Sequence, residues 1–120
     1  MADKIYDREG VMSRLDNDEE LFRELLVVFE EEWPKIIQVI ETAIAKGDSA
    51  TVALHAHSLK GALGNVGADR AAVVAKTLEF CGKDSKLAEA PALLTKLVAA
   101  VQEYRNALRV AGEPRGGGSS

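Results

Sequence analysis

The chain has 120 residues, of which 47% are hydrophobic and 28% are charged, and its formal net charge is −4. This length and balance fit one folded domain and exclude an extended disordered chain. The acidic balance and the 5% aromatic content exclude a basic, base-stacking nucleic-acid surface, and the single cysteine, Cys81, excludes an intramolecular disulfide.

Acidic caps and one apolar stripe predict the first two helices. Asp7 can cap a short helix that carries Val11, Met12 and Leu15. A long helix is expected from about Asp18 to Lys46, because apolar residues recur there at helical spacing: Phe22, Leu26, Phe29, Trp33, Ile36, Ile40 and Ala43. Pro34 lies inside this pattern and predicts a kink rather than an end, since the stripe continues in phase.

Glycine and aspartate residues divide the rest of the chain into three further helices. They are expected from Asp48 to about Val66, from about Asp69 until Gly82 closes the helix, and from about Leu87 to Val110. Strand-like alternation is lacking, so residues 1–111 are predicted to form an all-α antiparallel bundle. Residues 112–120 are predicted to be a disordered tail or linker remnant with no side chains to bury.

The third predicted helix carries an unusual polar face. At 100° per residue, His57 shares this face with Lys60, Gly61 and Gly64, while the apolar stripe points elsewhere. Glycine inside a helix costs about 1 kcal/mol relative to alanine. The two glycines therefore serve either close helix packing or open access to the imidazole, and their spacing does not decide between these. A neutral imidazole can accept a phosphoryl group, and Lys60 can hold a phosphate oxygen.

The segment His57-Ser58-Leu59-Lys60-Gly61, followed by Asn65-Val66-Gly67-Ala68, resembles the signature of bacterial histidine-containing phosphotransfer (HPt) domains. The acidic helix start, the Glu-Glu-Trp-Pro segment and Gly47-Asp48 are also similar, so the resemblance covers about residues 5–110. It implies a four-helix bundle with a short N-terminal accessory helix. It also implies a phosphocarrier that relays phosphoryl groups between receiver aspartates and has no ATP site of its own.

The resemblance also implies roles for single residues. His57 would be the phosphoacceptor, Lys60 would steady the phosphate, and Gly61 would give access. Some members place a glutamine near the histidine, on the next helix. The matching turn here carries Glu79, and an ionised carboxylate cannot donate a hydrogen bond to phosphate.

A partner must contact the surface around His57 to bring a phosphoryl group within reach of the imidazole. Antiparallel geometry places His57 near Leu78 of the following helix. We expect a docking patch with an apolar centre and a polar rim, formed by Trp33, Leu54, Ser58, Gly64 and Glu79. The expected partners are response-regulator receiver domains or a hybrid histidine kinase, with Mg²⁺ on the receiver and no cofactor or metal on this chain. We expect a cytoplasmic monomer that binds neither nucleic acid nor membrane.

Other interpretations of these residues remain open. His55 points about 200° away from His57, so the two cannot share a metal on one helical face, and His55 is predicted to be a boundary residue. The chain could instead be a helical interaction module without phosphotransfer. It could also be the kinase-substrate domain of a chemotaxis-type histidine kinase, phosphorylated by an ATP-binding domain.

Overall fold

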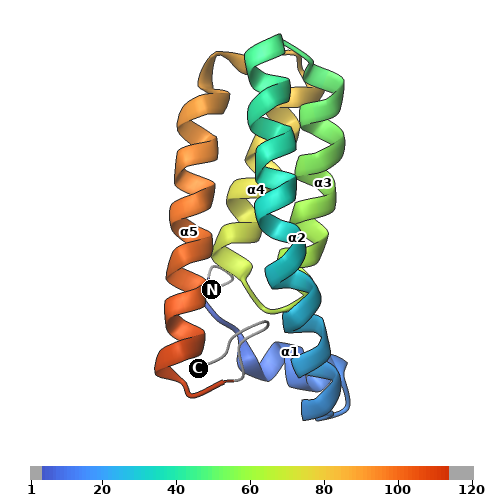
Figure 1. The fold of residues 1–120 in the computed structure, drawn as a ribbon, viewed down its shortest axis with the longest axis vertical. Coiled ribbons are helices and arrows are strands. Elements are labelled where there is room, and N and C mark those ends of the chain that lie inside the picture. Colours follow the sequence, from blue (N-terminus) through green and yellow to red (C-terminus); the bar gives the residue numbers. More distant parts are fainter. Residues whose placement is uncertain (1–3, 114–120) are drawn as a thin grey trace.

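The structure, a computed structural model, describes residues 4–113, and Figure 1 shows its helices in their predicted order. Helices α2 to α5 run antiparallel as a four-helix bundle, and α1 lies at its lower end in that view. Residues 4–113 contain no strand. The helices are α1 (Arg8–Arg14), α2 (Glu19–Lys46), α3 (Ser49–Asn65), α4 (Asp69–Lys83) and α5 (Ala90–Val110), with a 3₁₀ turn, η1 (Leu87–Glu89), before α5.

Three of the predicted helix starts are confirmed by their capping bonds. The side chains of Asp7, Asp18 and Asp48 each accept a hydrogen bond from the backbone amide three residues further on. Gly47 ends α2 with a φ of +71°, which is a left-handed conformation that glycine adopts without strain. Helix α2 continues through Pro34, as the uninterrupted apolar stripe predicted.

Two predicted boundaries are wrong. Gly82 does not close α4 but lies inside it and is buried. A Cβ atom there would come within 2.6 Å of the Ala53 backbone nitrogen and 2.9 Å of the Ser49 carbonyl oxygen. Gly82 therefore lets α3 and α4 pack with their backbones close together. The last long helix begins at Ala90 rather than Leu87, because residues 87–89 form the 3₁₀ turn.

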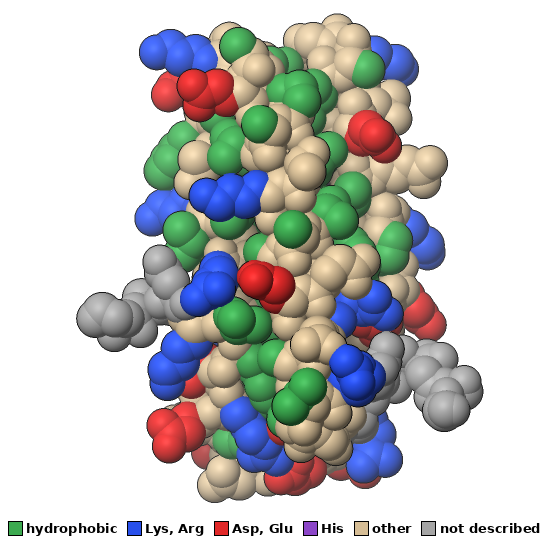
Figure 2. Space-filling view, turned by 90° about the vertical axis from the view of Figure 1, so that its left-hand side faces the viewer, with side chains coloured by type: hydrophobic (Ala, Val, Ile, Leu, Met, Phe, Trp, Pro, Cys, Tyr) green, Lys and Arg blue, Asp and Glu red, His purple; other side chains and the backbone are tan. Residues whose placement is uncertain are grey.

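The core consists of the apolar stripes that face the bundle axis, and α3 packs most extensively against α4. Its largest fully buried side chain, Tyr104, donates a hydrogen bond of 2.5 Å to the carbonyl oxygen of Val66. Figure 2 views the side on which α5 lies, where basic, acidic and apolar side chains are interspersed and no histidine is visible. No helix among residues 4–113 has the length and apolar character needed to cross a membrane.

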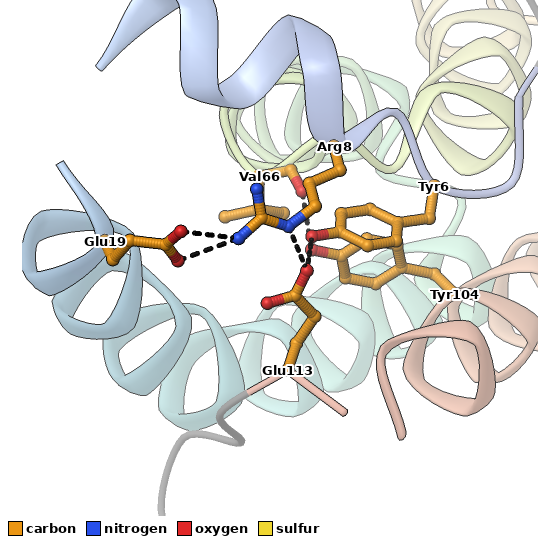
Figure 3. Close-up of polar contacts among 6 residues, drawn as sticks. All are labelled: Tyr6, Arg8, Glu19, Val66, Tyr104 and Glu113. Atoms are coloured by element: carbon orange, nitrogen blue, oxygen red, sulfur yellow. Dashed lines mark hydrogen bonds and ion pairs between the residues drawn. The ribbon is translucent and has the colours of Figure 1, made fainter. Parts of the chain in front are cut away.

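The two ends of the described chain are joined by a polar clasp, defined here as Tyr6, Arg8, Glu19 and Glu113 (Figure 3). The Glu113 carboxylate accepts hydrogen bonds from the Tyr6 hydroxyl at 2.7 Å and from Arg8 Nε at 2.5 Å. Arg8 also donates to Glu19. The Glu113 side chain is only 7% exposed. The prediction that residues 112–120 have no side chain to bury is therefore wrong at Glu113, and residues 114–120 lie outside the described residues.

The clasp should contribute measurably to stability. Replacing Glu113 by alanine leaves the Tyr6 hydroxyl and the Arg8 guanidinium without this acceptor, so we expect a loss of about 1–2 kcal/mol in the free energy of unfolding. The matched control is Glu103→Ala, which breaks an exposed pair with Arg70 at 3.7 Å and should cost less than about 0.5 kcal/mol. Urea unfolding measures both. Equal losses in the two variants would contradict a structural role for the clasp.

Candidate functional site

His57 projects from the middle of α3 into solvent. Its neighbours Ala56 and Leu59 are fully buried, so the helix turns the imidazole away from the core. The His57 side chain is 63% exposed. The other histidine, His55, is half-buried, and its Nδ1 lies 3.1 Å from the carbonyl oxygen of Thr51 on its own helix. The prediction that His55 is a boundary residue is confirmed.

A single buried carboxylate, that of Glu79 on α4, lies beneath His57. Its Oε2 is 2.9 Å from His57 Nδ1, and its Oε1 accepts a hydrogen bond of 3.0 Å from Lys60 Nζ. Lys83, one turn further along α4, brings its Nζ to 3.2 Å from Oε2. The Glu79 side chain is only 4% exposed, so this carboxylate connects α3 and α4 directly under the imidazole.

The charge on Glu79 determines which nitrogen of His57 carries the proton. The hydrogen bond from Lys60 lowers the pKa of the Glu79 carboxyl to about 2, helped by Lys83 and His57 and opposed by burial. An ionised carboxylate only accepts hydrogen bonds, so Nδ1 of His57 must be the donor. Nε2 of the neutral ring then keeps its lone pair, and this is the nitrogen able to attack an electrophile.

The protein surface beside His57 is open. A Cβ atom added to Gly61 or to Gly64 would meet no atom within 4 Å, apart from the backbone of its own helix. Close helix packing therefore does not explain these two glycines, in contrast to Gly82. The guanidinium of Arg14 on α1 donates a hydrogen bond of 2.8 Å to the Gly64 carbonyl oxygen, so a cation lies further along the same face of α3.

The predicted docking residues fall into two groups. Leu54, which is 64% exposed, and Ser58 lie on the outer surface of α3, and Gly64 is half-buried on the His57 face. Trp33 is only 8% exposed and belongs to the core, and Glu79 lies beneath His57 rather than at an exposed rim. Trp33 also lines a groove of about 230 Å³ between α2 and α3, together with apolar side chains including Val28 and Ile36.

Two residues near the site were missed by the sequence analysis. Lys83 lies four residues after Glu79, a spacing that typically forms an ion pair on a helix and could have indicated it. Phe80 is an exposed aromatic residue on α4, and the ammonium groups of Lys76 and Lys83 each lie 5.9 Å from its ring centroid. Phe80 follows the buried Leu78 by two residues, so helical spacing turns it about 200° away from the core and could have indicated its exposure.

The buried carboxylate also predicts how stability depends on pH. The pKa of Glu79 is lower in the folded protein than in the unfolded chain, so its contribution is fully present above about pH 4.5 and is lost as the pH falls towards 2. In Glu79→Gln, the decline in unfolding free energy between these pH values should be shallower than in the wild type. Urea unfolding at several pH values measures this slope. Parallel slopes in the two proteins would contradict the prediction.

Comparisons with known proteins relate the chain to one family and one solved structure. The family model of the Hpt domain matches residues 24–107. Among solved structures, histidine-containing phosphotransfer protein B (HptB) from Pseudomonas aeruginosa PAO1 is similar, with a TM-score of 0.81 and 25% sequence identity over 89% of this chain and 93% of that chain. No curated protein sequence matches the chain significantly. Residues 4–113 contain no group of three or more side chains that could hold a metal ion.

Proposed function

The chain belongs to the Hpt domain family, whose members are phosphocarriers of phosphorelays, and on this premise we propose that His57 exchanges phosphoryl groups with aspartates of response-regulator receiver domains. One observation carries the assignment of this residue. The exposed imidazole of His57 donates from Nδ1 to Glu79, which leaves Nε2 free towards solvent beside the open ground of Gly61 and Gly64.

The proposed reaction is an in-line exchange between two nucleophiles. The Nε2 lone pair forms a bond to phosphorus while the bond from phosphorus to the aspartyl oxygen breaks, and that electron pair returns to the carboxylate. The reverse step returns the phosphoryl group to an aspartate. We propose that this chain uses no cofactor of its own, and that the receiver supplies Mg²⁺ to neutralise charge on the phosphoryl oxygens.

Lys60 would stabilise the phosphoryl group during transfer. Its ammonium lies on the same face of α3 as His57 and is held at 3.0 Å from Glu79 Oε1. A flexible lysine side chain can move from this carboxylate to a phosphate oxygen. There its positive charge would stabilise the negative charge of the phosphoryl group during transfer. Lys83 would remain to pair with Glu79 when Lys60 moves.

The proposed docking surface has an apolar centre on α3, where Leu54 is exposed, and a polar border that includes Ser58. Titration with a receiver, followed by NMR, should move amide signals most within residues 54–64 and on the facing turns of α2 and α4. Amide shifts confined to the end of α5 near Leu108 would reject this surface.

Lys60→Met should keep the receiver affinity nearly unchanged but slow phosphoryl transfer, because the charge of Lys60 acts on the phosphoryl group as it moves.

Incubation with a panel of phosphorylated receivers, read by mass spectrometry, tests the proposed function. Rapid gain of a phosphoryl group from at least one receiver is the expected result. Labelling only by a histidine-kinase catalytic domain would instead indicate the substrate domain of a chemotaxis-type kinase, and no labelling by either would indicate an interaction module.

We further propose that the protein acts as a cytoplasmic monomer, which size-exclusion chromatography and cell fractionation can test. A hybrid histidine kinase that carries a receiver would be one source of the phosphoryl group.

A further inference from the structure

Glu79 contacts the ring nitrogen of His57 that the phosphoryl group would leave unused. We propose that Glu79 is a positioning residue that keeps a proton on Nδ1 of His57 throughout transfer, so that phospho-His57 is held as an imidazolium. The inference rests on the proposed function, because it concerns the same transfer. It adds a residue that controls how readily the phosphoryl group leaves again.

The balance of the transfer step shows why this proton matters. When Nε2 of the neutral ring bonds to phosphorus, Nδ1 keeps its hydrogen and the ring gains one positive charge. When the phosphoryl group moves on, the electron pair of the N–P bond returns to Nε2 and neutral imidazole leaves. If Nδ1 lost its proton while the group was bound, the leaving group would be an imidazolate anion, which leaves far less easily. The carboxylate 2.9 Å from Nδ1 opposes that loss of the proton.

The charged groups around this nitrogen come from three helices. On α4, Glu79 is flanked by Lys83, whose Nζ lies 3.2 Å from Oε2, and by Lys76, which lies near the Phe80 ring with Lys83. On α3, Lys60 binds the other carboxylate oxygen. On α1, Arg14 lies further along the His57 face. No charged side chain of α2 or α5 bonds to His57 or Glu79 within residues 4–113.

This arrangement predicts shifts of opposite sign for two substitutions. Glu79→Gln removes the negative charge and leaves the lysines, so the imidazolium of phospho-His57 should lose its proton more easily. Lys83→Met removes one positive charge that competes for Oε2, so the imidazolium should hold its proton more tightly. A purely structural effect of disturbing the α3–α4 contact would give no such reversal of sign.

The free protein offers the first test, by ¹⁵N NMR of the histidine rings. At pH 8, wild-type His57 should be almost entirely the Nδ1–H tautomer, while Glu79→Gln should show a mixture of the two tautomers. His55 is an internal control, because its Nδ1 lies against a backbone carbonyl and its spectrum should not change. A tautomer ratio of His57 that is equal in both proteins would overturn the inference.

The phosphorylated protein offers the second test, with phosphoramidate as the small-molecule phosphodonor. Titration of the ¹⁵N and ³¹P signals should show the pKa of phospho-His57 about one unit lower in Glu79→Gln and higher in Lys83→Met. Transfer to a receiver at pH 8 should be up to about tenfold slower in Glu79→Gln, with the difference vanishing below about pH 6. Glu103→Gln removes an equal charge from α5 and should match the wild type.

The outcomes distinguish this inference from the proposed function on which it rests. If neither phosphoramidate nor a receiver labels His57, the proposed function fails, and the tautomer measurement still decides what Glu79 does in the free protein. If phospho-His57 forms but titrates alike in the wild type and Glu79→Gln, the proposed function stands and the positioning role is overturned. Shifts of the same sign in Glu79→Gln and Lys83→Met would also overturn it.

Discussion

Replacing His57 by glutamine should abolish acid-labile phosphorylation of the protein, while His55→Gln should leave it largely intact. Glutamine keeps a polar side chain of similar reach at an exposed position, so the fold should survive, but it has no nucleophilic ring nitrogen. His55 is the matched control, because it lies on the same helix but binds the carbonyl oxygen of Thr51. Incubation with a phosphorylated receiver, followed by mass spectrometry and acid treatment, measures both variants.

Circular dichroism of the His57→Gln variant shows whether a loss of labelling results from misfolding. A folded, unlabelled variant supports His57 as the phosphoacceptor. Full labelling of His57→Gln would reject the assignment, and loss of labelling in His55→Gln alone would transfer it to the other histidine.

Gly82→Ala should destabilise the protein strongly, by a net amount of about 2 kcal/mol. The added methyl group would lie 2.6 Å from the backbone nitrogen of Ala53 and 2.9 Å from the Ser49 carbonyl oxygen, and backbone atoms cannot rotate away as a side chain can. Overpacking of this kind costs about 3 kcal/mol, and the better helix propensity of alanine returns only about 1 kcal/mol. Thermal and urea unfolding measure the difference.

Gly61→Ala is the matched control, because it makes the same chemical change on the facing helix. No atom beyond its own helix backbone lies within 4 Å of the added methyl group, so only helix propensity changes and the variant should gain up to about 1 kcal/mol. Gly61→Gln should remain folded but slow transfer from a receiver, because its longer side chain occupies the approach to His57. If Gly61→Ala destabilised the fold as much as Gly82→Ala, the access interpretation of Gly61 would be wrong.

The features that the sequence predicted correctly are those that depend on neighbours in the chain. Asp7, Asp18 and Asp48 cap helices through amides three residues away, and Gly47 needs only its own backbone conformation. The antiparallel register also followed from helix lengths and short loops, and it correctly placed His57 beside the turn of α4 that carries Glu79.

The features that the sequence could not predict depend on distant residues. Gly82 was interpreted as a helix end, because nothing local reveals that Ser49 and Ala53 press against it. Glu113 was assigned to a tail, because its partners Tyr6 and Arg8 lie at the opposite end of the chain. The role of Glu79 depends on its burial, since the same carboxylate in solvent would neither stay paired with two lysines nor keep the imidazole proton on one nitrogen.

The polar clasp also has a topological consequence. It brings residue 6 within a hydrogen bond of residue 113, so a short peptide could join the two ends and close the backbone into a ring. Ring closure restricts the unfolded chain more than the folded one and should raise the unfolding temperature without touching the histidine. New ends could then be opened in the exposed turn at residues 84–86, which would yield a permuted protein with the same bundle.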